Sequence, residues 1–313
     1  MSGLRFLVLG GGDGWHWNQL LDAAKSNDCE LAVAEYESLR SSIDDRGNCE
    51  IYCNAGRAED FDAILTRTMP AGSLEQITFR LATLHHLTKQ MPIVNSPRGL
   101  EVAIDKFATV EQVRRLGYPV PPTIVVQSRS EAMRAFDELG GDCIVKPIFG
   151  GEGRGVSRIR DRELAWYAFS TLEQLNRVLY VQQFIGPGGS DTRMLVIGDE
   201  VIGVRRENAN GFRTNHSDGA RPTAVQLTEE QITMARRITT SIGLLFASVD
   251  VIDSDDGTGR VLEVNAVPGW RSAQSVVQDS IADKVIGTLI DQATDWAGRS
   301  TNETDLPLTG DLS

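Results

Sequence analysis

The chain is poor in long apolar runs and in basic charge. No stretch reaches the roughly 18 apolar residues that a membrane-spanning helix requires, and the N-terminal apolar segment 4–9 is too short for a signal peptide and leads into glycines. We therefore expect no membrane association and a cytoplasmic location. The formal net charge is -12, which argues against nucleic acid as a main partner because a phosphate backbone needs a basic face.

Cysteine is also scarce. Cys29, Cys49, Cys53 and Cys143 show no zinc-like spacing. Free thiols in a reducing compartment are expected, with chelation or cross-linking of Cys49 and Cys53 as the alternative.

A glycine-rich turn, Gly10–Gly14, follows segment 4–9 and precedes a predicted helix over 18–25. Strand, glycine turn and helix together open an α/β unit. The dinucleotide-binding fingerprint is incomplete, because Trp15 stands where its third glycine is required. We interpret the turn as packing of the first lobe, and contact of its aromatic residues with an acceptor substrate is the alternative.

Three oxygen-bearing side chains lie close together near the end of the chain. Asp250 belongs to one β-branched run, and Glu263 and Asn265 belong to the next. The turn-rich connection predicts a hairpin with Glu263 and Asn265 on one face and with Leu262 and Val264 buried on the other. Carboxylate and amide oxygens without Cys or His are typical ligands of Mg²⁺. The alternative is a sheet face whose polar residues are merely solvated.

A predicted strand over 142–147 ends on Lys146 and leads into a loop with four glycines between Gly150 and Gly155. Glycines let the backbone approach a ligand and turn its amides towards an anion. The loop is not a Walker A loop, because its lysine precedes the glycines. A simple hairpin turn is the alternative, but a strand-end lysine and a metal site in one chain favour a nucleotide.

Seven motifs in sequence order carry a resemblance to a known family. They are Asp105-Lys106, Lys146 with its glycine loop, Gln183-Phe184-Ile185, Asp191-x-Arg193, Arg213-Thr214-Asn215, Asp250, and Glu263-x-Asn265-x-x-Pro268-Gly269. This order resembles the ATP-grasp superfamily, and within it the RimK-like carboxylate-amine ligases, over residues 95–292. Segments 67–76 and 94–98 further resemble the subgroup related to tetrahydromethanopterin glutamate ligases.

The resemblance implies a role for each matched residue. ATP would be bound by Lys106, Lys146, Gly151, Gly153, Gly155, Gln183, Phe184, Ile185, Asp191, Arg213, Thr214 and Asn215. One or two Mg²⁺ or Mn²⁺ ions would be held by Asp250, Glu263 and Asn265. The catalytic residues would be Arg193, Arg206 and Arg213. Of these, Arg193 and Arg206 are the candidates for holding the γ-phosphate or the substrate carboxylate. Many relatives carry glutamate at the position of Gln183. With glutamine there, the expected contact with adenine is through the main chain and not through a carboxylate.

By the same resemblance, the protein is expected to join a carboxylate to an amine, that of glutamate, while ATP is converted to ADP and phosphate through an acylphosphate. The carboxylate would belong to a small molecule or a peptide, with a pterin cofactor as one candidate, and similar proteins commonly form homo-oligomers. Two alternatives stay open: an ATP-dependent kinase that does not ligate, and a catalytically inactive ATP-binding regulatory module.

The implied fold is α/β in class, with α+β ATP-binding lobes in an ATP-grasp arrangement. We expect an N-terminal pre-ATP-grasp α/β lobe over 1–97, a small ATP-binding lobe with the glycine-rich loop over 98–185, a large ATP-grasp lobe with the metal site over 186–297, and a polar tail over 298–313. The apolar periodicity predicts helices over 73–90, 105–116 and 279–296. Capping boxes are predicted at Ser73/Gln76 and Thr228/Gln231.

Overall fold

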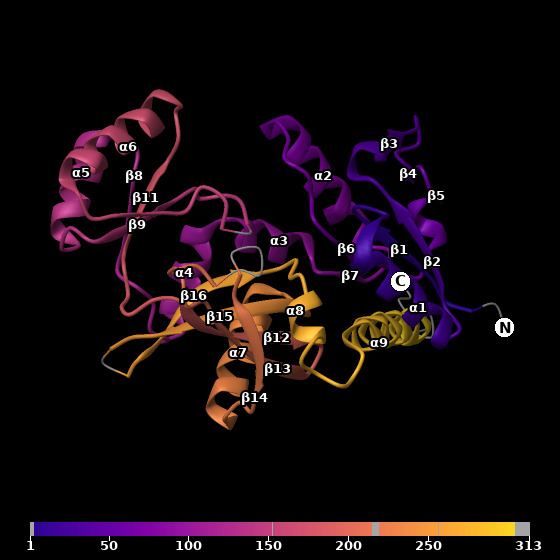
Figure 1. The fold of residues 1–313 in the computed structure, drawn as a ribbon. Coiled ribbons are helices and arrows are strands. Elements are labelled where there is room, and N and C mark those ends of the chain that lie inside the picture. Colours follow the sequence, from indigo (N-terminus) through magenta and orange to yellow (C-terminus); the bar gives the residue numbers. More distant parts are fainter. Residues whose placement is uncertain (1–2, 152, 215–218, 256, 304–313) are drawn as a thin grey trace, which may run out of the picture. The chain divides into compact units, whose positions relative to one another are not determined.

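The computed structural model describes residues 3–151, 153–214, 219–255 and 257–303, with side chains described as far as residue 299. The chain forms two compact units, one from residues up to Pro97 together with those from Asp279 on, the other from Arg98–Gln278. Figure 1 shows the helices and strands of both units. Within the described ranges, no helix is long and apolar enough to cross a membrane.

The first unit is built on a parallel sheet with the strand order β2-β1-β6-β7. Its strands are β1 (Arg5–Leu9), β2 (Glu30–Ala34), β6 (Ala63–Thr66) and β7 (Ile93–Val94). All apolar residues of β1 are buried, as expected for a parallel strand covered on both faces. Helix α1 (Gly14–Ser26) lies against β2, and α9 (Ile281–Glu303) lies against α1 and β6. The sequence analysis placed the α9 segment with the large lobe, whereas its buried apolar stripe packs within this first unit.

A small antiparallel sheet, β3-β4-β5, also belongs to the first unit. Its elements are β3 (Arg40–Ile43), β4 (Cys49–Cys53) and β5 (Gly56–Arg57), flanked by the 3-10 helices η1 (Tyr36–Ser38) and η2 (Ala58–Asp60). Helix α2 (Leu74–Leu87) begins with the predicted capping box, in which Ser73 and Gln76 exchange hydrogen bonds. All four cysteines are free thiols.

The second unit contains an antiparallel sheet with the order β10-β9-β11-β8. Its strands are β8 (Thr123–Val126), β9 (Cys143–Lys146), β10 (Ser157–Ile159) and β11 (Leu179–Gln183). Helices α5 (Arg129–Glu138) and α6 (Arg162–Gln174) lie together on this sheet and bury an apolar core around Phe136 and Phe169 (Figure 1). Helices α3 (Pro97–Ile104) and α4 (Lys106–Arg115) precede the sheet, and Asp105 caps α4 by accepting from two backbone amides.

The other sheet of the second unit is antiparallel with the order β14-β13-β12-β15-β16. Its strands are β12 (Ser190–Ile197), β13 (Glu200–Glu207), β14 (Arg221–Val225), β15 (Phe246–Asp253) and β16 (Gly259–Asn265). Helix α7 (Glu229–Ile242) packs on β12, β13 and β15, and it starts with the predicted Thr228/Gln231 capping box. Helix α4 lies against β16 and α7, and the short helix α8 (Arg271–Gln274) lies against β14.

Candidate active site

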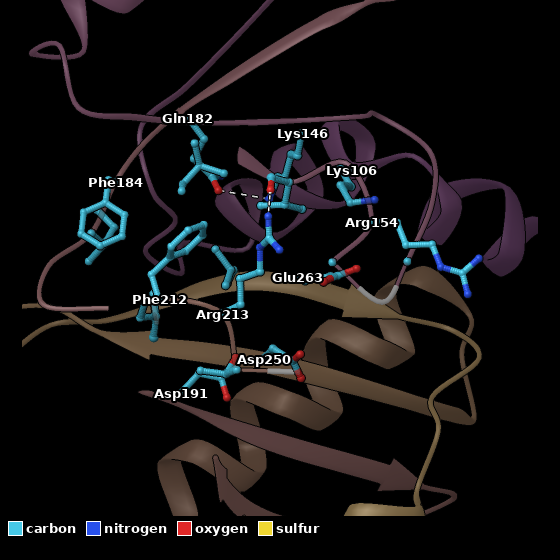
Figure 2. A pocket seen from close by; sticks show the side chains of 18 of the residues that line it. Lys106, Lys146, Arg154, Gln182, Phe184, Asp191, Phe212, Arg213, Asp250 and Glu263 are labelled. Carbon is cyan, nitrogen blue, oxygen red and sulfur yellow. Dashed lines mark hydrogen bonds between the residues drawn. The ribbon is translucent and has the colours of Figure 1, made fainter. Parts of the chain in front are cut away.

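A cavity that is open in part to solvent is lined by residues of both sheets of the second unit. The strand ends of β9 and β11, the glycine loop after β9, the segment after β13 and the β15–β16 hairpin all contribute to its walls. Figure 2 shows two phenylalanine rings at one end of the cavity, the lysines at the other, and two aspartates beneath them. The arrangement offers an apolar end and a cationic end to one elongated ligand.

Most of the residues predicted from the sequence line this cavity. They are Lys106, Lys146, Gly151, Gly153, Gln183, Phe184, Ile185, Asp191, Arg206, Arg213, Thr214, Asp250 and Glu263. Gly155, Arg193 and Asn265 do not line it, and Asn215 lies outside the described residues. Gly155 instead supports the loop: a Cβ there would come within 3.2 Å of Pro147 Cδ, and its φ of +73° is left-handed.

Two buried lysines occupy the cationic end. Lys146 ends β9, and its ammonium donates to Gln182 Oε1 at 3.1 Å and lies 5.0 Å from the centre of the Tyr180 ring. Burial lowers the pKa of Lys146 to about 8; Glu263 opposes this shift and Lys106 adds to it. Lys106, at the start of α4, also has a pKa below its usual range because of burial. Both ammonium groups lie near Glu263 and would gain from a polyanionic ligand.

Gln182 is a buried site residue that the sequence analysis missed. It lines the cavity beside Lys146, and its amide group donates to Thr123 Oγ1 at 2.9 Å and to the Tyr180 hydroxyl at 3.2 Å. The sequence carried a signal for it, since Tyr180 and Gln182 are polar residues on one face of an otherwise apolar buried strand.

The glycine loop is anchored to α4 at two points. The backbone amide of Lys106 donates to the Ile148 carbonyl at 3.2 Å, and the Lys106 ammonium donates to the Gly150 carbonyl. Gly150 and Gly153 have φ values of +119° and +71°, which side-chain-bearing residues rarely adopt. The loop therefore holds its shape beside Lys146 through glycines and one lysine.

Aromatic side chains form the opposite end of the cavity. The rings of Phe184 and Phe212 meet edge to face with centroids 6.1 Å apart. The guanidinium of Arg158 lies 3.3 Å from the centre of the Phe184 ring and donates two hydrogen bonds to the Asp142 carboxylate, at 2.7 and 2.5 Å. Arg213 reaches across to donate to the Val156 carbonyl. A flat heterocycle could pack here against Phe184.

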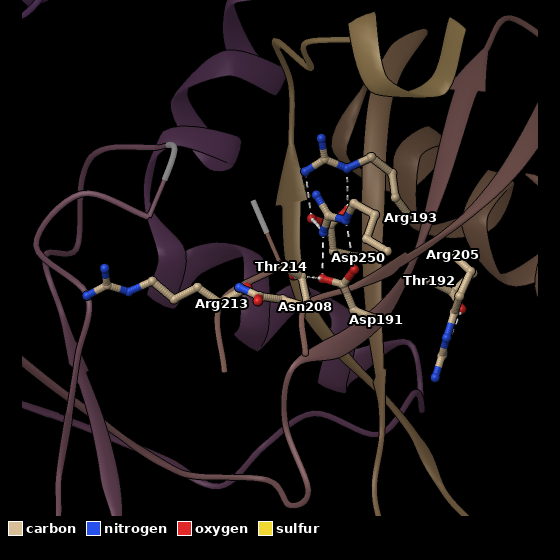
Figure 3. A network of polar contacts seen from close by, with 9 residues as sticks. Asp191, Thr192, Arg193, Arg205, Asn208, Arg213, Thr214 and Asp250 are labelled. Carbon is tan, nitrogen blue, oxygen red and sulfur yellow. Dashed lines mark hydrogen bonds and ion pairs between the residues drawn. The ribbon is translucent and has the colours of Figure 1, made fainter. Parts of the chain in front are cut away.

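A buried network of ion pairs lies under the cavity (Figure 3). Arg206 binds Asp191 through two hydrogen bonds, at 2.7 and 2.5 Å, and also donates to Asp250 at 2.8 Å. Arg193 binds Asp250 through two hydrogen bonds at 2.8 and 2.7 Å, and Thr214 donates to Asp191 at 2.5 Å. Burial raises the pKa of Asp250, but the two arginines outweigh burial and hold this pKa below its usual range. In this state, both arginines predicted to hold phosphate or carboxylate are bound to aspartates.

The predicted hairpin is present, and it pairs Asp250 directly with Glu263. A β-bulge follows at Asp250/Val251, so that Val251 pairs with Val261 and Leu262 is the extra residue. Leu262 therefore lines the cavity beside Glu263 instead of being buried on the far face, where Val261 and Val264 lie. The expectation that Leu262 is buried with Val264 was wrong, because strict alternation does not allow for a bulge.

The oxygen atoms of the hairpin fit a hard divalent cation. Asp250 and Glu263 are opposite each other on adjacent strands and both face the cavity. Asn265 lies two residues on, and its Oδ1 accepts from the Val267 amide at 2.9 Å, which leaves the second lone pair of that oxygen for a metal. Nowhere in the described ranges, this hairpin included, does a group of three or more His, Cys, Asp or Glu side chains come together, so a cation here would depend on two carboxylates and one amide oxygen. Two carboxylates and one amide oxygen suit Mg²⁺ better than a soft metal.

Comparison with known families gives this geometry a context. The RimK-like ATP-grasp domain matches residues 103–289. The chain belongs to this family. The RimK-like match spans the cavity, both of its lysines and the β15–β16 hairpin.

Among similar curated proteins is a tetrahydromethanopterin:alpha-L-glutamate ligase of Methanosarcina acetivorans, 33% identical over 68% of this chain and 74% of that protein. The protein of the same name from Methanococcus maripaludis is 28% identical over 90% of this chain and 95% of its own length. Among solved structures, the ATP-grasp ligase PsnB in complex with a minimal precursor, Mg and ADP matches with a TM-score of 0.73 at 22% identity, covering 94% of this chain and 99% of that one.

These comparisons confirm the expected family and the mixed α/β ATP-grasp fold. The enzymatic class follows from the family: the RimK-like relatives are ATP-dependent ligases that form carbon–nitrogen bonds, and this chain is a ligase of the same kind. The resemblance to the glutamate ligase subgroup is also confirmed, since the relatives above carry that name.

Proposed function

We propose that this RimK-like ligase binds ATP in the cavity of its second unit and adds glutamate to the carboxylate of an acceptor, with release of ADP and phosphate. One observation carries the proposal: two buried lysines and two cross-strand carboxylates, Asp250 and Glu263, face the same cavity. Two ammonium groups in one cavity suit a polyphosphate, and carboxylates in the same cavity suit the metal cation that accompanies it.

The nucleotide would lie with its base at the aromatic end and its phosphates at the lysine end. Phe184, held by Arg158, offers a face for the adenine ring, and the backbone from Gln183 to Ile185 offers hydrogen bonds to its edge. Lys106 and Lys146 would neutralise phosphate oxygens beneath the glycine loop. The Asp191 carboxylate already accepts hydrogen bonds from Arg206 and Thr214. It would accept from a ribose hydroxyl only through its remaining lone pairs.

Asp250, Glu263 and Asn265 would hold Mg²⁺, with Mn²⁺ as the substitute that the same oxygen ligands accept. When bound, the ion would offset negative charge on the β- and γ-phosphate oxygens. Asp250 then has to share its oxygens between this ion and the two arginines that now hold it.

The chemistry proposed for the reacting groups needs no side-chain nucleophile. An oxygen of the acceptor carboxylate attacks the γ-phosphorus of ATP, the bond to the β-phosphate oxygen breaks, and ADP leaves. The amine nitrogen then attacks the carbon of the resulting acylphosphate, loses a proton, and expels inorganic phosphate as the amide forms. Arg206 and Arg213 line the cavity, so these two cations can stabilise the charge that develops on phosphoryl and carbonyl oxygens. Arg193 does not line the cavity and would act through Asp250, to which it is bound.

For the substrates, glutamate as the amine and a pterin-linked carboxylate as the acceptor are supported by the names of the relatives. A cytoplasmic location is proposed because ATP and reduced thiols are both available there.

The test is release of ADP from MgATP, measured with and without glutamate across a panel of carboxylates that includes pterin cofactors and acidic peptides. Ligation predicts that release depends on both the carboxylate and the amine, and that the amide product is seen by mass spectrometry. Release of ADP that does not require an amine would contradict ligation and indicate a kinase. Binding of ATP with no release under any condition would replace the proposal by a regulatory binding module.

A further inference from the structure

The side chain of Lys146 is held by a chain of hydrogen bonds that runs away from the cavity. Lys146 donates to Gln182 Oε1, Gln182 Nε2 donates to Thr123 Oγ1 at 2.9 Å, and Thr123 Oγ1 donates to the Pro121 carbonyl at 2.8 Å. Strand register brings these residues together, because Tyr180 pairs with Lys146 and Gln182 pairs with Thr123 across the sheet. This series of hydrogen bonds ends on the Pro121 carbonyl, a backbone atom whose position is fixed by the fold.

The direction of each hydrogen bond in this chain is determined. The Thr123 hydroxyl has one proton, and it points at the Pro121 carbonyl, so the hydroxyl can only accept from Gln182. The nitrogen of the Gln182 amide must therefore face Thr123 and Tyr180, and its oxygen must face Lys146. An ammonium group carries only donors, so this is the one amide orientation that satisfies both ends.

The neutrality of Gln182 is as important as its position. Gln182 is 1% exposed and Lys146 is 7% exposed, so a carboxylate at position 182 would form a buried ion pair with the ammonium. An amide oxygen holds the ammonium in place without cancelling its charge. The carboxylate that does lie near Lys146, that of Glu263, comes from β16 of the other sheet and faces the cavity.

From these contacts we infer that Gln182, backed by Thr123, is a positioning residue that aims the charge of Lys146 at the phosphates of the bound nucleotide. Gln182 acts through its contact with Lys146 at the phosphate end. Phe184 of the adenine end follows two residues later, just past the end of β11, so the experiment has to measure the two ends of the cavity separately. The inference rests on the proposed binding of ATP, and it goes beyond it by assigning a residue outside the matched motifs.

The experiment compares the affinities of ATP, ADP and adenosine by calorimetry in four variants. Gln182→Glu cancels the charge of Lys146, Gln182→Met removes the acceptor at similar volume, Thr123→Val removes the hydroxyl at similar shape, and Thr123→Ser restores the hydroxyl. Gln174→Glu, on an exposed position of α6, is the matched control for the added carboxylate. The thermal midpoint and circular dichroism of each variant report on the fold.

We expect Gln182→Glu to weaken the binding of ATP and ADP by about tenfold or more, because the buried carboxylate pairs with the Lys146 ammonium and cancels the charge that the phosphates would meet, while adenosine binds as in the parent. Thr123→Val and Gln182→Met should show the same pattern with a smaller loss, and Thr123→Ser and Gln174→Glu should match the parent. In steady-state assays the change should fall mainly on KM for ATP and less on kcat.

Equal losses for adenosine and ADP would overturn the inference, because they would show a general disturbance of the cavity. Unchanged ATP affinity in a folded Gln182→Glu or Thr123→Val protein would overturn it as well. If Gln182→Glu does not fold, the inference is tested by Thr123→Val and Thr123→Ser, of which only Thr123→Val should weaken the binding of ATP and ADP. The ligase proposal fails separately, if the parent protein binds ATP normally and forms no amide.

Discussion

Arg206 and Asp191 form a two-point ion pair in which Nε lies 2.7 Å from Oδ1 and Nη2 lies 2.5 Å from Oδ2. Both residues are almost fully buried, at 5% and 1% exposure. The same Nη2 donates to Asp250 at 2.8 Å, so one guanidinium joins the carboxylate of Asp191 to that of Asp250, the proposed metal ligand. The pair is therefore part of the floor of the active site and a fixed support for Asp250.

This ion pair should show strong energetic coupling. Asp191→Ala leaves the Arg206 guanidinium buried with fewer acceptors and should lower the free energy of unfolding by about 3–5 kcal/mol. The double variant with Arg206→Ala should lose less than the sum of the single variants, by roughly 1–3 kcal/mol, because the first substitution has already removed the interaction. Urea denaturation without ligand measures each value. Arg162→Ala removes a similar two-point pair with Asp137 that is exposed, and it should have little effect. Additive losses at Asp191 and Arg206 would contradict the coupling.

Glu263 should be required for turnover but not for folding. Glu263→Gln keeps the shape of the side chain and removes its charge from the cavity, next to both lysines and opposite Asp250. We expect ADP release to fall by about 100-fold or more, since the loss of a metal-holding carboxylate removes several kcal/mol of charge stabilisation. The thermal midpoint should stay near that of the parent. Asp253→Asn, which changes an exposed carboxylate on the same hairpin, is the control and should remain active. An active Glu263→Gln enzyme would remove the metal site from the proposal.

The affinity for ATP should decline at alkaline pH. Burial lowers the pKa of Lys146 to about 8, so the ammonium form that binds phosphate is complete below this pH and is lost above it. Between pH 7 and pH 9 the dissociation constant of ATP should rise about tenfold, because each proton that must be bound costs a factor of ten per pH unit above the pKa. Lys146→Arg should remove this dependence, since arginine stays protonated. The same pH slope in both proteins would assign the titration to another group.

Local signals in the sequence predicted much of this fold. The capping boxes at Ser73/Gln76 and Thr228/Gln231 are present, because each depends only on residues three positions apart. The hairpin that pairs Asp250 with Glu263 was also predicted, since alternation and a short connection determine it. The roles of the individual site residues remain predictions.

Other features depend on contacts between distant segments, which periodicity does not report. The sequence gives no sign that Arg193 would bind Asp250, since 57 positions separate them and the strand register alone brings them together. The packing of α9 against α1 and β6 is of the same kind, because its apolar stripe fits any exposed apolar face. For Gln182 the polar face of β11 was a local signal, but its contact with Lys146 depends on the register that pairs β11 with β9.

The β-bulge gives a final prediction that separates two neighbouring residues. Leu262 lines the cavity proposed for the nucleotide, while Val261 is 2% exposed and packs on the other side of β16. Leu262→Ala should weaken ATP about fivefold, since roughly 1 kcal/mol of apolar contact with the ligand is lost, and should change the thermal midpoint little. Val261→Ala should instead lower the free energy of unfolding by roughly 1–3 kcal/mol with little change in affinity for ATP. For both variants, calorimetry measures the affinity for ATP and urea denaturation measures the free energy of unfolding. The reverse assignment, with Leu262 stabilising the fold and Val261 affecting ATP, would show that the strand alternates without a bulge.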